Sequence, residues 1–157
     1  MSDKKTLIAY YSHSGNTKKV SEKIQTITGG NMFEIQPVNK YSNNYNEVVN
    51  QAKIENKNDT RPELISNGDI QNYDIIFVGT PVWWYTMASP VKTFLASHNW
   101  DNKVIVPFCT HGGGGASNTY RDIQKIAQNA KVLNGYTSYE NSAKIEDIKT
   151  WINNLNL

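Results

Sequence analysis

Apolar runs of strand length alternate with helical segments along almost the whole chain, and this alternation restricts the possible folds most strongly. The runs "YDIIFVG" (73–79) and "KVIVPFC" (103–109) are almost continuously apolar, which is typical of strands covered on both faces. Strands that alternate with helices predict a parallel sheet whose crossover connections are right-handed.

The pattern predicts five strands and five helices. The strands are expected at residues 8–11, 32–38, 73–79, 103–109 and 131–136, and the helices around residues 20–27, 48–52, 91–95, 123–130 and 145–155. Pro37 indicates that the second strand lies at a sheet edge, and Pro107 indicates a local bulge, because proline cannot donate a ladder hydrogen bond. Ser89 is expected to cap the third helix, with Pro90 at its first position.

Composition excludes several classes of function. The 157 residues predict a single domain spanning 1–157. The net charge of +2 is spread along the chain, so no nucleic-acid-binding face is expected. No apolar run approaches the roughly 20 residues of a membrane-spanning helix, so no membrane contact is expected. The lone cysteine, Cys109, and the lack of an export signal favour the cytoplasm.

Three strand ends lead into unusual loops, at residues 12–17, 80–86 and 110–117. Ligands of parallel sheets bind beyond the carboxyl ends of the strands, so these loops are expected to meet at one edge. The first loop, "SHSGNT", brings hydroxyls and a glycine to a helix N-terminus, which suits a phosphate. Neither nucleotide-binding pattern, GxxxxGK[ST] or GxGxxG, occurs. Ordinary helix capping is the alternative explanation.

The other two loops suit a flat ring. "TPVWWYT" places three aromatic residues in succession, and they cannot all point into one core, so at least one is expected to stack on a ligand or to pack the loop down. "THGGGG" resembles an esterase oxyanion hole, but the chain has no GxSxG nucleophile motif, which argues against hydrolysis. The glycines then allow backbone N–H groups to come close to a ring edge that a Cβ would block, or they form a flexible surface loop. His111 is either a proton donor or a spacer.

These three loops resemble those of the flavodoxin family. "SHSGNT" resembles the FMN phosphate loop, "PVWWYTMASPVKTFL" resembles the aromatic flavin loop with its following helix, and "IVPFCTHGGGG" resembles the third flavin loop of a bacterial subgroup. The resemblance spans nearly the whole chain and implies the short form of the family. It implies an α/β fold with three layers, a doubly wound five-stranded parallel sheet of strand order 2-1-3-4-5, and FMN at the switch point.

The resemblance also implies the cofactor-binding residues. The phosphate would be held by Ser12, His13, Ser14, Gly15, Asn16 and Thr17. The ring would lie between Thr80, Pro81, Val82, Trp83, Trp84 and Tyr85 on one side and Thr110, His111, Gly112, Gly113 and Gly114 on the other. No metal site is implied. Trp84 is favoured slightly over Trp83 as the stacking ring.

A protein of this family would carry electrons between redox partners, either proteins or small-molecule acceptors. Two departures favour an alternative, an NAD(P)H-dependent FMN oxidoreductase resembling quinone reductases. Electron-carrier flavodoxins are usually strongly acidic, whereas this chain carries a net charge of +2. The third loop also has glycines where carriers commonly place an aromatic residue, which would leave one flavin face open.

Overall fold

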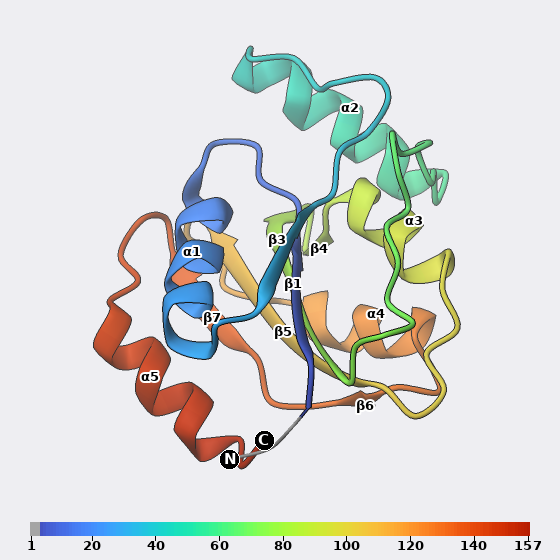
Figure 1. Cartoon of the computed structure of the whole chain (residues 1–157). Helices are drawn as coiled ribbons and strands as arrows, with labels where there is room; N and C mark the ends of the chain where they lie inside the picture. The colour runs from blue at the N-terminus through green and yellow to red at the C-terminus, as the bar shows by residue number, and fades with distance from the viewer. Residues whose placement is uncertain (1–3) are drawn as a thin grey trace.

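A parallel sheet runs through the centre of the protein, with helices on both of its faces (Figure 1). The structure is a computed structural model and describes residues 4–157. These residues form seven strands: β1 (Thr6–Tyr10), β2 (Asn31–Glu34), β3 (Ile75–Trp83), β4 (Thr86–Met87), β5 (Val104–His111), β6 (Lys131–Val132) and β7 (Tyr136–Tyr139).

The order β2-β1-β3-β5-β6 confirms the predicted order 2-1-3-4-5. The two additional strands are short. β7 pairs with β5 in parallel and continues the position of β6, so β6 and β7 together form the fifth strand. β4 pairs antiparallel with the end of β3 and forms a hairpin that extends from the carboxyl end of the sheet.

All five expected helices are present within the described residues: α1 (Asn16–Thr28), α2 (Tyr45–Lys57), α3 (Ser89–Ala96), α4 (Thr119–Ile126) and α5 (Ile145–Asn154). In Figure 1, α1 and α5 lie on one face of the sheet, while α3 and α4 lie on the other. The second helix, α2, lies farther out, beyond the end of β3. The predicted three-layer arrangement is therefore confirmed.

Each face of the sheet has its own apolar core. Ile8 and Phe77 pack on the α1 and α5 side with Ile148 of α5, and all three side chains are fully buried. Ile76 packs on the other side with Phe94 of α3. Because neighbouring residues of one strand point to opposite faces, both kinds of position must be apolar, which explains the continuous runs in the sequence.

The first helix begins and ends where the sequence permits it. Gly15 precedes the helix with φ of 98°, and the Ser12 hydroxyl accepts hydrogen bonds from the N–H groups of Gly15 and Lys18 at 3.1 and 3.2 Å. Gly29 ends the helix with φ of 72° and donates to the carbonyl of Gln25. Glycine adopts this left-handed conformation readily, because it has no Cβ to clash with the backbone.

Two expected details differ in the structure. β2 ends at Glu34, so Pro37 lies beyond the strand and forms an isolated antiparallel bridge with Leu64. The strand nevertheless occupies the sheet edge as expected. The third helix begins at Ser89 rather than after it, and the N-cap is Ala88.

The bulge expected at Pro107 lies on the neighbouring strand instead. β5 pairs with β3 without interruption, but between β6 and β7 three residues, 133–135, stand opposite only Val106 and Pro107. Proline has no N–H to offer on this side, so the fifth strand loses its pairing there. The Tyr120 ring fills this break, because a Cβ on Gly135 would collide with it.

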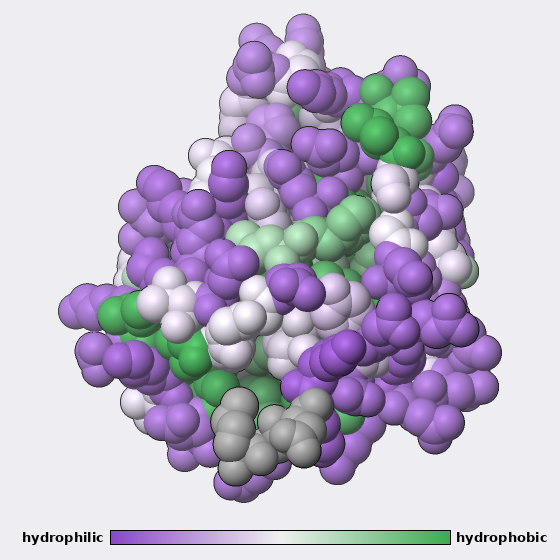
Figure 2. Space-filling model, viewed as in Figure 1, coloured by the Kyte–Doolittle hydropathy of each residue, from purple (hydrophilic) through white to green (hydrophobic). Residues whose placement is uncertain are grey.

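In the part of the chain from residue 4 to residue 157, no helix is both long and apolar enough to cross a bilayer. The face seen in Figure 2 is mostly hydrophilic, and its apolar areas are small and separate.

Gly79 provides a test of the sheet packing. It pairs with Phe108 across β3 and β5, and a Cβ at Gly79 would collide with the Phe108 ring. We expect Gly79→Ala to lower the free energy of unfolding by roughly 1 to 3 kcal/mol, as overpacking does. Urea denaturation measures this change. The double variant Gly79→Ala, Phe108→Leu should recover part of the loss, and full stability of the single variant would contradict the packing described here.

Candidate functional site

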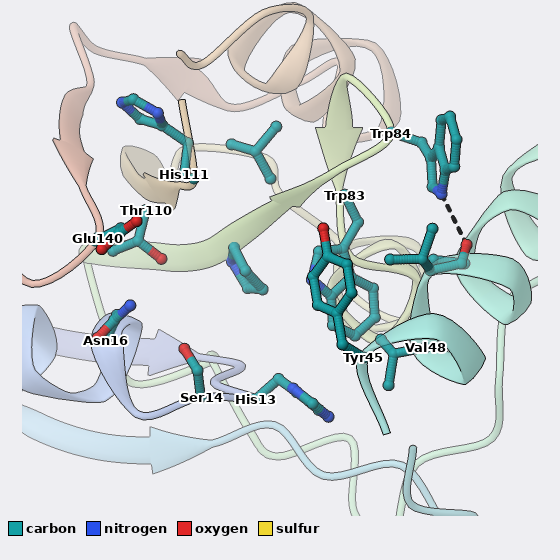
Figure 3. Close-up of a pocket in the computed structure, with 15 residues that line it drawn as sticks. His13, Ser14, Asn16, Tyr45, Val48, Trp83, Trp84, Thr110, His111 and Glu140 are labelled. Carbon is teal, nitrogen blue, oxygen red and sulfur yellow. Dashed lines mark hydrogen bonds between the residues drawn. The ribbon is translucent and has the colours of Figure 1, made fainter. Parts of the chain in front are cut away.

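The three loops predicted to meet at the carboxyl edge of the sheet surround a cavity of about 450 Å³ (Figure 3). Ten of the predicted site residues line it: His13, Ser14, Asn16, Pro81, Val82, Trp83, Trp84, Thr110, His111 and Gly112. In Figure 3, Ser14 and Asn16 lie at one end of the cavity, with Trp83 and Trp84 across from Thr110 and His111. All three loops therefore contribute to a single site.

The other seven predicted residues are Ser12, Gly15, Thr17, Thr80, Tyr85, Gly113 and Gly114, which do not line this cavity. Three of them use their hydroxyls inside the protein. Ser12 caps α1, and the buried Thr17 hydroxyl bonds to the Thr110 hydroxyl at 2.8 Å, which joins the first loop to the third. Thr80 accepts from the N–H of Ala88 and donates to the carbonyl of Pro81.

The start of α1 provides the anion-binding character of the site. The helix dipole places partial positive charge there, and the first turn carries no acidic residue to compete with an anion. The Ser14 hydroxyl points into the cavity in Figure 3, next to Asn16. His13 fixes the outer side of the loop, because its Nε2 atom lies 2.9 Å from the Ser42 carbonyl oxygen.

Trp83 forms a rigid aromatic wall. Its ring makes edge-to-face contacts with Tyr11, His13 and Tyr41, with centroids 5.6, 5.8 and 5.0 Å away. Burial, followed by the charge of Glu55, raises the pKa of Tyr11, and burial, followed by a hydrogen bond to Glu55, raises the pKa of Tyr41. Both hydroxyls therefore stay protonated at neutral pH, and this wall carries no tyrosinate charge.

Trp84 joins the aromatic loop to α2. Its indole N–H donates to the Val49 carbonyl oxygen at 2.8 Å, shown by the dashed line in Figure 3. The Asn56 side chain donates to the Trp84 carbonyl at 3.3 Å, and the Lys53 ammonium lies 5.5 Å from the centroid of the indole ring. These contacts hold α2 against one side of the cavity.

Five lining residues were not predicted from the sequence: Tyr45, Val48, Val49, Ala52 and Glu140. The first four belong to α2, and the short apolar stripe of that helix was the only indication of a buried face. Glu140 follows β7, and its N–H donates to the His111 carbonyl at 2.8 Å. A hydrogen bond and negative charge from Glu140 raise the pKa of the adjacent Tyr139.

The third loop is ordered by His111. Its Nδ1 atom accepts hydrogen bonds from the N–H groups of Gly113 and Gly115 at 3.0 and 3.1 Å. The neutral imidazole therefore carries its proton on Nε2, because Nδ1 is already an acceptor. This arrangement argues against a flexible surface loop, one of the two alternatives left open by the sequence.

A smaller cavity of about 230 Å³ adjoins the main one. The two cavities share Val82, Trp84, His111 and Gly112, and the smaller one also contacts Tyr85 and Gly114. Two of the predicted residues outside the main cavity therefore line this second space. Chemically, the combined site offers an anion-binding helix N-terminus, flat apolar walls and a run of backbone N–H groups.

Solved structures of flavoproteins resemble this chain over nearly its whole length. A proposed flavoprotein of Bacteroides eggerthii has 27% identity and a TM-score of 0.87, with 99% of each chain covered. A proposed flavoprotein of Bacteroides uniformis has 29% identity and a TM-score of 0.86, covering 96% of this chain and 98% of that one. A Lactobacillus acidophilus flavoprotein in complex with FMN has 27% identity and a TM-score of 0.76, covering 95% and 99%.

No curated protein sequence matches the chain significantly. The family model of flavodoxin matches residues 5–155, which include every strand and helix described above. The sheet order and the three loops at its carboxyl edge agree with that match. The chain therefore belongs to the flavodoxin family.

Proposed function

We propose that the protein binds FMN in the main cavity and transfers electrons between redox partners. The observation that carries this proposal is the position of a helix N-terminus suited to phosphate at one end of a cavity with flat aromatic and apolar walls. The FMN complex of the Lactobacillus acidophilus relative supports it. A cytoplasmic location is part of the proposal, since Cys109 is a free buried thiol.

The residues present fit this cofactor. The cavity of about 450 Å³ is within the range of roughly 300 to 1,000 Å³ that is usual for small-molecule sites. Ser14 and Asn16 would hold the phosphate together with backbone N–H groups of α1. Trp83, Trp84 and the apolar side chains of α2 would contact the ring. When bound, FMN supplies a centre that accepts and donates one or two electrons.

The residues around the cavity would then hold the cofactor in place and set the charge around it. The aromatic cluster around Trp83 keeps one wall rigid, and α2 excludes water from that side of the cavity. Glu140 contributes the one carboxylate among the described lining residues, and a negative charge there disfavours additional negative charge in the site. The net charge of +2 makes docking to a basic partner protein unfavourable, so an acidic or small-molecule partner is expected.

The phosphate end of the site is tested with Ser14→Ala. A charge-assisted hydrogen bond contributes roughly 1.5 to 3 kcal/mol, so we expect FMN to bind one to two orders of magnitude more weakly. Riboflavin lacks the phosphate and should bind nearly as before. Fluorescence titration of both flavins measures the two affinities. Thr26→Ala, at an exposed position of α1, is the control. Equal losses for FMN and riboflavin would place the phosphate elsewhere.

The contribution of α2 is tested with Trp84→Phe. Phenylalanine keeps an aromatic ring but removes the indole N–H that donates to Val49. One such hydrogen bond is worth about 0.5 to 1.5 kcal/mol, so FMN affinity should fall about two- to twelve-fold, and amide exchange in α2 should accelerate.

Trp151→Phe is the matched control for this change, because the Trp151 indole also donates to a backbone carbonyl, that of Asn134, at 2.9 Å. It should leave FMN affinity and exchange in α2 unchanged. If the two variants behave alike, α2 does not hold the cofactor through Trp84.

An NAD(P)H-dependent FMN oxidoreductase is the second candidate function. The observation that favours it is the glycine loop, where a Cβ at Gly112, Gly113 or Gly114 would meet no atom within 4 Å. Nothing from these residues covers a flavin that lies beside them, so a substrate ring has access.

Anaerobic stopped-flow absorbance distinguishes the two functions. If the protein is a carrier, we expect NADH and NADPH to reduce its flavin too slowly to support turnover, whereas a reductase partner reduces it rapidly. Dithionite reduction provides the fully reduced reference spectrum. Rapid reduction by either nicotinamide, with saturation at increasing concentration, would replace the carrier assignment with the enzyme.

A further inference from the structure

We propose that Ser138 is a positioning residue for the phosphate group of the ligand: its buried hydroxyl donates to Thr110, which in turn donates to a phosphate oxygen. This inference rests on the proposed FMN site and adds to it a residue that does not line the cavity. It follows from an unpartnered buried hydroxyl, the register of β5 and β7, and the hydrogen-bonding capacity of three neighbouring hydroxyl groups.

Ser138 carries a buried hydroxyl without a partner. Only 3% of the residue is exposed, and within residues 4–157 its Oγ atom has no hydrogen-bond partner. Burying an unpaired hydroxyl costs free energy, so proteins rarely keep one without a reason, such as a ligand or a trapped water. The chain itself does not supply that partner in this arrangement.

The register of the sheet shows which way Ser138 points. It stands opposite Thr110 across β7 and β5, and residues paired in this way share a face of the sheet. The pair Phe108 and Tyr136, two residues earlier on the same strands, packs in the core between the sheet and helices α1 and α5. The Thr110 hydroxyl bonds to Thr17 of α1, so it lies on this face as well. Ser138 therefore faces α1.

Thr110 connects this position to the main cavity. It lines the cavity, and its hydroxyl oxygen lies 2.8 Å from that of Thr17 in the first turn of α1. Glu140, two residues after Ser138, lines the cavity too. In Figure 3, Asn16, Thr110 and Glu140 lie on one side of the cavity, away from the two tryptophan rings. Ser138 thus lies directly behind the cavity wall, beside the helix N-terminus proposed for the phosphate.

The hydrogen-bonding capacity of the three hydroxyls fits a ligand oxygen. A hydroxyl group donates one hydrogen bond and accepts two. When Thr17 and Ser138 both donate to the Thr110 oxygen, the hydrogen of Thr110 is left for a ligand. Neighbouring strands lie about 4.8 Å apart, so rotation about the Cα–Cβ bond of Ser138 brings its hydroxyl within reach of Thr110. A ligand oxygen that accepts from Thr110 then leaves all three hydroxyls paired.

The charge of the site favours a phosphate oxygen as that acceptor. None of the residues that line the main cavity is Lys or Arg, so neutral donors must hold a phosphate there. Hydrogen bonds to a charged acceptor are stronger than those between neutral groups, and donors in a chain polarise one another. A donor behind Thr110 therefore contributes most when a phosphate is bound.

The test is a fluorescence titration of the flavin-free protein with FMN and with riboflavin. Ser138→Ala should weaken FMN binding by roughly three- to ten-fold, the effect of about one net hydrogen bond. Riboflavin lacks the phosphate and should bind as before. Ser138→Cys keeps a side chain of similar size whose thiol is only a weak donor, so it should weaken FMN by a similar factor. This second variant separates a lost donor from lost packing.

A double variant tests whether Ser138 acts through Thr110. Thr110→Val keeps the shape of the side chain but removes the hydroxyl. In that background, Ser138→Ala should weaken FMN binding no further, because the interaction between the two residues is already lost. An additional loss as large as in the single variant would mean that Ser138 does not act through Thr110, and would overturn the proposal.

Thr119→Val is the matched control. Among residues 4–157, Thr119 carries the other buried side-chain oxygen without a partner, and it lines neither cavity. Each of Thr119→Val and Ser138→Ala removes an unpaired buried hydroxyl, so neither should lower the urea midpoint of the flavin-free protein. Only Ser138→Ala should weaken FMN binding.

Three results would overturn the proposal. Ser138→Ala could bind FMN as the unchanged protein does, as expected if the hydroxyl bonds only to a trapped water. It could weaken FMN and riboflavin equally, or it could lower the urea midpoint of the flavin-free protein, which would show that the hydroxyl already has a structural partner. An unchanged protein that binds no FMN contradicts the proposed function itself, whereas these three results concern Ser138 alone.

Discussion

The parallel register of β1, β3 and β5 is the constraint on which the site depends. Tyr10 pairs with Gly79, and Gly79 pairs with Phe108, so the three strands run in register toward the carboxyl edge, where β3 continues to Trp83 and β5 to His111. The loops that follow them must therefore meet. The buried hydrogen bond between Thr17 and Thr110 fixes the first loop to the third. The sheet therefore holds both loops of the site in place.

The elements that the sequence predicts well are those whose pattern has a local cause. Buried parallel strands must be apolar on both faces, which makes β3 and β5 recognisable from their residues alone. The break in the fifth strand is different. It depends on Pro107 lying opposite residues 133–135, and pairing between segments so far apart in the chain cannot be inferred from either segment.

The candidate site shows the same division. The first loop is recognisable because a glycine and hydroxyls at a helix N-terminus either bind an anion or cap the helix. The sequence does not distinguish a hydroxyl that faces the cavity from one that caps the helix. Ser14 faces the cavity, whereas Ser12 caps α1. The wall formed by α2 was not predicted, because its position depends on the hydrogen bond from Trp84 to Val49, 35 residues apart.

Backbone strain is concentrated at the same edge of the sheet. Seven described residues other than glycine have positive φ, and three of them are Asp or Asn, which tolerate the left-handed conformation. The other four are Trp84, which lines both cavities, and Tyr85, Ser117 and Glu140, which line one cavity each. Such conformations persist only where the surrounding structure enforces them. The sheet thus supplies the stability that lets its carboxyl edge keep unfavourable local conformations, and that edge is where ligands of the fold bind.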